Sequence, residues 1–281
     1  MTLDSATITA KSSISPVVGP LLHKTDIVGL SLHELEAKVT TLGLPKFRAR
    51  QIWRWVWRHG LTGFDEMSDL GKQVRELLGL HFSIDRPAVS QRLQSVDGTI
   101  KWLIRFTDGN EAECVYIPDR ARGTLCISSQ VGCTLTCSFC HTGTQKLVRN
   151  LTVAEICGQV LLAMDELNDW PSGKPERRLT NIVLMGMGEP LFNYENVSTA
   201  LRVIMSGEGV AISKRRITLS TSGVVPEISR CGRELGVNLA ISLHATNDKL
   251  RNDLVPINRK YPLAELIDAC RNYPGLSNAR R

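Results

Sequence analysis

The sequence predicts an α/β protein in which a small helical domain and a β-hairpin segment precede a parallel sheet of about four βα units. Apolar residues recur at helical spacing over residues 26–85, and polar and apolar residues alternate around Asp-Gly turns over residues 86–122. Strand-type and helix-type segments then alternate over residues 123–281. Serial βα units imply a parallel sheet that is either doubly wound or barrel-like. Residues 1–25 are expected to form a flexible tail.

The composition is that of an ordinary globular protein. The 281 residues allow one large and one small domain, and 42% of them are hydrophobic while 22% are charged. No apolar run approaches the roughly 20 residues that span a bilayer, and the first residues lack the apolar core of a signal peptide. We therefore expect a cytoplasmic protein without membrane contact. The net charge of +6 weakly favours a polyanionic partner.

Three helices are expected in residues 26–85. The first has apolar residues on one face, at Leu32, Leu35, Val39 and Leu42. Its end is indicated by Gly43-Leu44-Pro45, and two further helices are expected over residues 47–59 and 71–80. Residues 44–60 carry Lys46, Arg48, Arg50, Arg54 and Arg58 without any acidic residue. This stretch, with residues 214–216, is predicted to contact phosphates. Some of Trp53, Trp55 and Trp57 must lie in the core, because alternate positions cannot all share one helix face.

The remaining elements follow the chain in order. Asp97-Gly98 between residues 92–95 and 100–106 predicts a hairpin, because Asp-Gly suits a type I′ turn. Strands are expected over residues 112–117, 124–128, 182–187, 217–220 and 239–243. Helices are expected over residues 153–167, 194–205, 226–235 and 263–271. The first of these helices begins with the capping-box pattern Thr152-x-x-Glu155.

Three of the eight cysteines lie within eight positions, as Cys133, Cys137 and Cys140. Zinc in a structural site needs four protein ligands, and His141 is too near Cys140 to complete a tetrahedron. Cys137-Ser-Phe-Cys-His141 also matches the attachment motif of c-type haem, which normally accompanies export. The third candidate is an iron–sulfur cluster, in which three thiolates would leave one iron of a four-iron cubane open to a ligand. The cluster follows a predicted strand, at the end where parallel α/β folds place their chemistry.

Longer motifs resemble the radical S-adenosylmethionine (SAM) superfamily and, within it, the RlmN family of dual-specificity RNA methyltransferases. The resemblance covers about residues 26–281 in order. The matching motifs lie at residues 45–53, 126–133, 181–191, 214–223 and 242–245. It implies a partial (βα)6-type radical SAM barrel, with residues 26–85 as an RNA-binding-like domain, 86–122 as a hairpin linker and 123–281 as the core.

The resemblance also implies cofactors and site residues. Cys133, Cys137 and Cys140 would hold a [4Fe–4S] cluster, whose open iron binds SAM and allows its reductive cleavage. The SAM contacts would be Gly188, Glu189, Ser220, Ser242, Leu243 and His244. Taken alone, these residues, which apart from Leu243 are polar or glycine, lie at the ends of successive predicted strands, and such strand ends are expected to converge on one opening.

Two further residues acquire roles through the resemblance. Glu113 would accept the proton that adenine carbon 2 loses, and Cys126 would form a transient disulfide that breaks a protein–RNA intermediate. One SAM would methylate a cysteine of the protein and a second would generate the radical that activates this methyl group. The implied substrates are an adenosine of 23S rRNA in the peptidyl-transferase centre and the adenosine beside the anticodon in tRNA. A reducing, flavodoxin-like electron donor and a monomeric enzyme are also implied.

The sequence departs from the family pattern near its end. A radical SAM core has six βα units, whereas Arg281 follows soon after the fourth predicted strand, and Cys270 does not match the methyl-carrying cysteine. We therefore expect the chain to be C-terminally incomplete and to bind a cluster without completing RNA methylation. Two alternatives remain: a relative that methylates adenine C8 and confers antibiotic resistance, and a non-catalytic RNA-binding protein with an iron–sulfur or zinc site.

Overall fold

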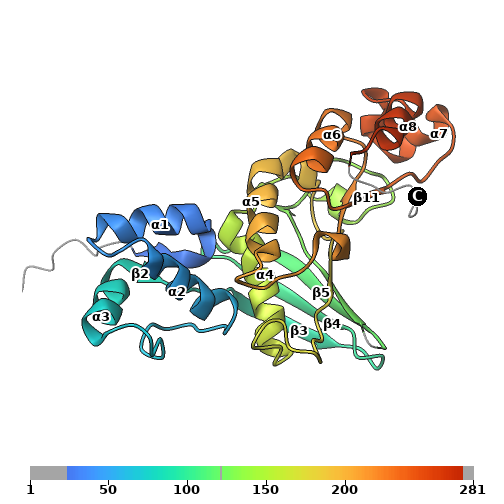
Figure 1. Ribbon diagram of the computed structural model, residues 1–281. Helices are drawn as coiled ribbons and strands as arrows, with labels where there is room; N and C mark the ends of the chain where they lie inside the picture. Colours follow the sequence, from blue (N-terminus) through green and yellow to red (C-terminus); the bar gives the residue numbers. More distant parts are fainter. Residues whose placement is uncertain (1–23, 121, 275–281) are drawn as a thin grey trace, which may run out of the picture.

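The computed structural model describes residues 24–120 and 122–274, so residues 1–23 of the expected tail lie outside the described part. A helical N-terminal unit stands beside a seven-stranded sheet that carries the remaining helices (Figure 1). No helix of the described residues is long and apolar enough to cross a membrane.

The N-terminal unit contains the three predicted helices: α1 (Leu32–Thr41), α2 (Phe47–Trp57) and α3 (Lys72–His81). A parallel pair of short strands, β1 (Thr25–Asp26) and β2 (Phe82–Ser83), closes it. Ser31 caps α1, because its Oγ accepts from the Glu34 amide at 3.2 Å while the Glu34 carboxylate accepts from the Ser31 amide at 2.7 Å. Trp53 and Trp57 of α2 are four residues apart, so they lie on one helix face, and both are buried.

The basic side chains of residues 44–60 are partly paired, which the local sequence did not indicate. Glu36 of α1 lies 2.9 Å from Lys46 and 3.8 Å from Arg50, and Glu208 lies 3.4 Å from Arg54. These carboxylates come from outside residues 44–60, so an acid-free stretch of sequence does not give an acid-free surface.

Seven strands form one mixed sheet in the order β11–β10–β9–β6–β5–β4–β3. The antiparallel part consists of β3 (Ala88–Gln94), β4 (Ile100–Arg105) and β5 (Glu111–Asp119). The parallel part consists of β6 (Arg122–Cys126), β9 (Asn181–Leu184), β10 (Ile217–Thr221) and β11 (Asn238–Ile241). Since β5 pairs with β6, the segment 86–122 is continuous with the core sheet.

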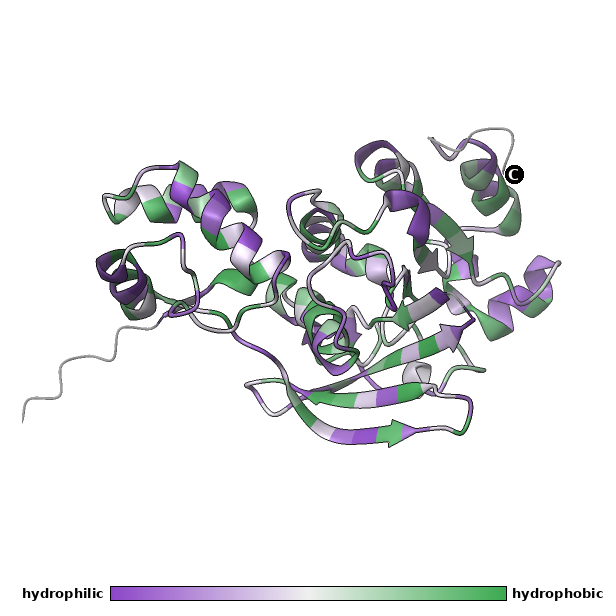
Figure 2. Ribbon diagram, turned by 60° about the horizontal axis from the view of Figure 1, so that its bottom comes forward, coloured by the Kyte–Doolittle hydropathy of each residue, from purple (hydrophilic) through white to green (hydrophobic). Residues whose placement is uncertain are grey.

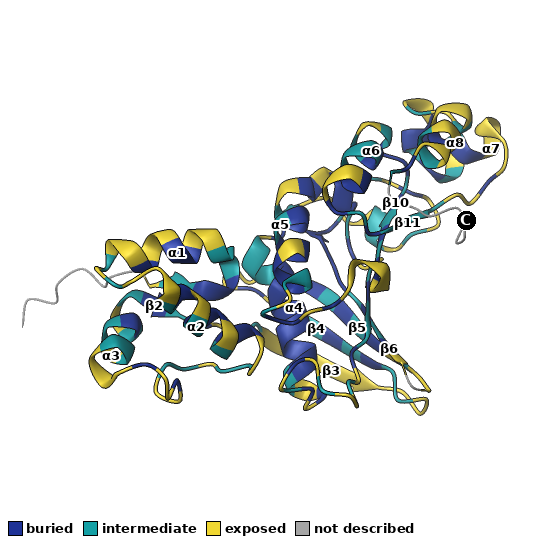
Figure 3. Ribbon diagram, in the orientation of Figure 1, coloured by how far each residue is buried: buried dark blue, intermediate teal, exposed yellow. Residues whose placement is uncertain are grey.

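The four parallel strands are neighbours in chain order, which favours the barrel-like sheet over the doubly wound one. Their connecting helices are α4 (Val153–Glu166), α5 (Tyr194–Met205) and α6 (Val225–Glu234). One face of β6, β9 and β10 is buried and the other is partly exposed, and residue hydropathy alternates along the strands (Figures 2 and 3). This is the arrangement of a barrel wall, because a doubly wound sheet reverses its strand order and is covered on both faces.

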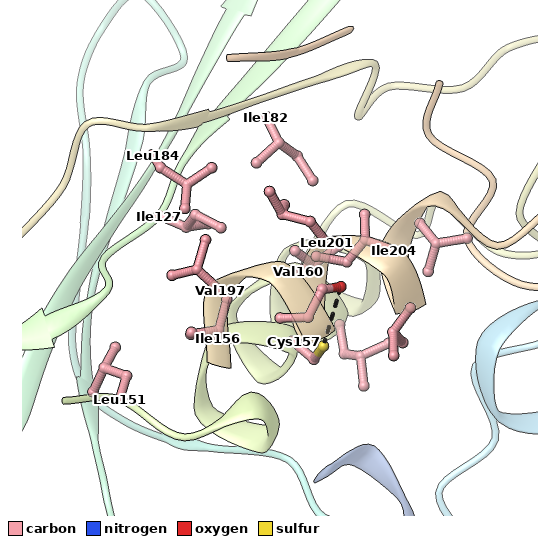
Figure 4. Close-up of a cluster of buried hydrophobic side chains, with 14 of the residues drawn as sticks. Ile127, Leu151, Ile156, Cys157, Val160, Ile182, Leu184, Val197, Leu201 and Ile204 are labelled. Carbon is pink, nitrogen blue, oxygen red and sulfur yellow. Dashed lines mark hydrogen bonds between the residues drawn. The ribbon is translucent and has the colours of Figure 1, made fainter. Parts of the chain in front are cut away.

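The core lies between the sheet and helices α4 and α5. Ile182 and Leu184 of β9 lie across from Val197 and Leu201 of α5, all four buried (Figure 4). α4 is buried over most of its length because both the sheet and neighbouring helices cover it (Figure 3). The chain continues past β11 through α7 (Asp248–Leu254), a 3-10 turn (Pro256–Arg259) and α8 (Leu263–Arg271). α7 was not predicted from the sequence.

Candidate metal and cofactor site

A cavity of about 300 Å³ lies at the carboxyl ends of the four parallel strands. The end of each strand contributes to the lining: the cysteine loop after β6, residues 184–186, 188 and 189 at the end of β9, residues 220–222 at the end of β10, and Ser242 and His244 after β11. Its size falls at the lower end of the range for small-molecule sites. Segments separated by more than 100 residues in sequence therefore meet at one opening.

All three predicted cluster cysteines line this cavity. The loop that carries them is held by backbone hydrogen bonds. The Ser138 amide donates to the Leu254 carbonyl of α7 at 3.1 Å, and the Cys140 amide donates to the Cys137 carbonyl at 3.1 Å. The Cys133 sulfur accepts from the Leu135 amide at 3.3 Å. The structure thus brings together the residues that the spacing C-x₃-C-x₂-C had singled out.

The donor set fits an iron–sulfur cluster better than a single ion. All eight cysteines are free thiols, and no group of three His, Cys, Asp or Glu side chains among the described residues is arranged around one metal ion. Ligands of a cubane bind three different iron atoms and need not converge on a single point. Burial raises the pKa of the Cys133 and Cys137 thiols, while an interaction with Ser222 opposes the rise at Cys137. Bound iron would offset the free-energy cost of ionising these buried thiols, because it stabilises the thiolates.

Glu189 is buried at the floor of the cavity, with its carboxylate hydrogen-bonded to backbone. It accepts from the Ser222 amide at 2.8 Å and the Leu191 amide at 3.2 Å. Burial raises the pKa of Glu189 to about 7, and these amides oppose the rise. A ligand cation beside this carboxylate would favour its ionised form.

The two glycines before Glu189 serve the protein's own packing. A Cβ at Gly188, whose φ is +98°, would lie 2.5 Å from the Gln130 Cβ. A Cβ at Gly186 would lie 2.7 Å from the Ser128 Oγ. Although both glycines line the cavity, their tightest contacts are within the chain.

The ends of β10 and β11 place three of the four predicted side chains at the cavity. Ser220, Ser242 and His244 line it, whereas Leu243 does not. The His244 ring lies against Phe139 of the cysteine loop, with ring centroids 3.8 Å apart, and His244 has a left-handed φ of 56°. The predictions missed Phe139, Thr221 and Ser222, which carry no spacing signal of their own.

Arg251 of α7 is a fully buried cation behind this cavity. Its Nη2 donates to the carbonyls of Ser222 at 2.7 Å and Ser242 at 3.2 Å, and its Nε donates to the Leu243 carbonyl at 3.0 Å. Its Nη1 donates to the Asn258 Oδ1 at 2.7 Å. One guanidinium therefore joins the ends of β10 and β11, while the C-terminus of the same helix holds the cysteine loop.

Glu113 and Cys126 lie outside the cavity lining, on the partly exposed face of the sheet. Cys126 of β6 pairs with Val115 of β5, so Glu113, two residues before Val115, lies on the same face as Cys126. Lys101 of β4 forms an ion pair with Glu113, and this partner was not predicted. Burial is the main cause that raises the pKa of Cys126, and the charge of Glu113 adds to it.

Two family models match the chain. Residues 25–84 match the ribosomal RNA large subunit methyltransferase N-terminal domain, and residues 127–276 match the radical SAM superfamily. A dual-specificity RNA methyltransferase RlmN from Granulibacter bethesdensis is 61% identical over 92% of this chain and 66% of its own length. The corresponding protein from Chelativorans sp. is 53% identical over 100% of this chain and 73% of its own length.

A solved structure has the same fold. The crystal structure of a radical SAM methyltransferase from Sphaerobacter thermophilus matches with a TM-score of 0.81 and 45% identity, over 89% of this chain and 72% of that one. It confirms the predicted α/β, radical SAM-type architecture. The chain spans slightly less than two thirds of the length of several curated relatives, such as 60% for the protein from Rhodospirillum rubrum. These matches favour neither a C8-methylating relative nor a non-catalytic protein. The chain belongs to the radical SAM superfamily and, within it, to the RlmN family of dual-specificity RNA methyltransferases.

Proposed function

We propose that this chain acts in the SAM-dependent methylation of carbon 2 of adenosine in 23S rRNA, at the peptidyl-transferase centre, and in tRNA, next to the anticodon. The observation that carries the proposal is the single cavity where three cysteines meet the ends of four parallel strands. The names of the similar proteins support the substrate class.

Cys133, Cys137 and Cys140 would hold a [4Fe–4S] cluster, which supplies the electron for reductive cleavage of SAM when it is bound. Glu189 would accept a hydrogen bond from the SAM ammonium group. Gly188, Ser220, Ser242 and His244 would complete the pocket wall, and Leu243, whose carbonyl accepts from the Arg251 Nε, would help to fix the loop that carries Ser242 and His244. Enclosure at the strand ends would exclude water from the reacting atoms.

Glu113 would accept the proton that leaves adenine carbon 2. Its carboxylate is 45% exposed and its ion pair with Lys101 fixes its position, so an RNA base can approach it from the uncovered face of the sheet. Cys126 would release the methylated RNA by forming a transient disulfide with the methyl-carrying cysteine, as the bond from that cysteine's sulfur to the RNA-linked carbon breaks and the carbon takes up a proton. The exposed basic residues of α2 would contact RNA phosphates.

Three further features belong to this proposal: a cytoplasmic location, a monomeric state and a flavodoxin-like reductant. The absence of a membrane-spanning helix among the described residues is compatible with the first of these.

Anaerobic reconstitution with iron and sulfide tests the proposal. We expect about four irons per chain, an absorbance that dithionite bleaches, and release of 5′-deoxyadenosine from SAM. Cys137→Ala should lose all three signals, while Cys270→Ala, a control on α8 away from the cavity, should keep them. Retention of zinc alone would contradict the proposed function. Unchanged iron content, absorbance and 5′-deoxyadenosine release in Cys137→Ala would also contradict it.

A further inference from the structure

A second cavity, of about 370 Å³, lies at the opposite edge of the parallel sheet from the cysteines. Arg122, Arg177 and Arg216 line it, together with Thr180 and Ser213. A neighbouring cavity shares Arg122 and Arg177. Neither cavity contributes to the site described above.

The topology explains why three arginines distant in sequence converge there. Arg122 is the first residue of β6, Arg177 lies four residues before β9, and Arg216 immediately precedes β10. These three strands are adjacent and parallel, so their amino ends meet at one edge of the sheet.

The positive charge of this cavity is not balanced by the residues that line it. No carboxylate contributes to this lining, although Glu176 lines the neighbouring cavity. The carboxylate that acts on Arg177 is Asp169, which is fully buried, accepts from the amides of Arg178 and Leu179 at 2.9 and 2.8 Å, and lies 3.4 Å from Lys174. Burial lowers the pKa of Arg177, and the nearby charge of Arg216 lowers it further. Two like charges are thus held together at a cost in free energy.

Arg177 also has unused hydrogen-bonding capacity. Its Nη1 donates to the Val210 carbonyl at 2.7 Å, which fixes the side chain in place. Its Nε and Nη2 are buried and have no hydrogen-bond partner within the described part of the chain. Leaving buried guanidinium donors without an acceptor is unfavourable, so an acceptor that reached them from the cavity would be favoured.

We propose that this cavity binds a phosphate-type oxyanion between Arg122, Arg177 and Arg216. A tetrahedral group with several charged oxygens can accept from three guanidinium groups at once, which a single carboxylate does less completely. The oxyanion comes either from an RNA backbone or from a free phosphate compound, and both sources present the same oxygens. The site is separate from the cysteine cavity, so the inference does not depend on cluster or SAM binding.

Charge-removing variants of the intact chain test the proposal. Arg122→Gln and Arg216→Gln replace exposed side chains, so folding is expected to persist. Arg271→Gln is the control, because Arg271 is an exposed arginine of α8 that does not line the cavity and was not predicted to contact phosphates. In a buffer free of multivalent anions, Arg216→Gln should be at least as stable as the unmodified chain, since it removes a repulsion.

Two measurements separate the sources of the anion. With inorganic phosphate as the probe, we expect a saturable rise in the melting temperature of the unmodified chain. Arg122→Gln and Arg216→Gln should lose this rise and Arg271→Gln should keep it, which would identify a free-anion site. With an RNA hairpin as the probe, the same two variants should bind about tenfold more weakly, and the slope of log affinity against log salt should fall by about 1. A positive result in either arm supports the proposal. If both probes act equally on the unmodified chain and all three variants, the proposal is overturned.

Discussion

The Nη2 of Arg251 lies 2.7 Å from the carbonyl oxygen of Ser222, which places a buried cation directly behind a residue of the cysteine cavity. The same nitrogen reaches the Ser242 carbonyl at 3.2 Å. Two loops after neighbouring strands are therefore fixed by one side chain. Because α7 also bonds the cysteine loop through Leu254, this helix connects three walls of the cavity.

Replacing Arg251 by Lys should destabilise the fold although it keeps the charge. A lysine ammonium cannot reproduce the planar fork that serves Ser222, Ser242 and Leu243 together. We expect a loss of about 2–4 kcal/mol in the free energy of unfolding, measured by urea denaturation. Arg259→Lys, at an exposed position with a 3.9 Å ion pair, should change it by less than about 0.5 kcal/mol. Equal stability of the two variants would rule out the bracing role of Arg251.

Gly188→Ala should disrupt the cavity floor. The new Cβ would lie 2.5 Å from that of Gln130, and the φ of +98° disfavours any side chain. We expect a destabilisation of about 2–4 kcal/mol in thermal or urea unfolding. Gly207→Ala provides the comparison, since nothing lies within 4 Å of its added Cβ. A Gly188→Ala protein as stable as Gly207→Ala would show that this packing is not required.

Stability should depend on pH through Glu189. Its pKa is about 7 in the folded chain against a usual value of 4.5, so between these values the folded state holds a proton that the unfolded state has released. The free energy of unfolding therefore falls as pH rises from about 4.5 to 7, by up to about 3 kcal/mol. Glu189→Gln should remove this component. Urea unfolding at pH 5 and 7.5 gives the free energy of unfolding of the two proteins. The same change between these pH values in both proteins would contradict the prediction.

Two variants of His244 separate the effect of its backbone conformation from the effect of its imidazole ring. His244→Val should be less stable than His244→Gly by about 1–2 kcal/mol, because a β-branched residue is poorly accommodated at a φ of 56°. Both variants lose the ring that lies 3.8 Å from that of Phe139, so both should bind SAM about 2–10-fold more weakly. Thermal melts and calorimetric titration with SAM measure the two effects. Wild-type affinity in His244→Gly would exclude a role for the ring contact.

Much of the architecture was predictable from local patterns. The capping box of α4, for example, forms as expected, with the Glu155 amide donating to the Thr152 Oγ1 at 3.2 Å. The alternation of strand and helix segments predicted the four βα units, and the strand-end positions predicted Ser220, Ser242 and His244 at one cavity. The sequence did not predict α7, a seven-residue helix whose polar sequence gives little periodic signal.

The candidate site residues could be singled out from the sequence alone, because the cysteine spacing and the strand-end motifs are local properties of the chain. Which distant groups act on them depends on the tertiary structure. Arg251 reaches Ser222 across 29 residues, Lys101 meets Glu113 across a strand pair, and three arginines meet at one sheet edge. Burial likewise sets the pKa of Glu189. These properties depend on contacts between segments far apart in the chain and on the exclusion of water, neither of which a local pattern of residues contains.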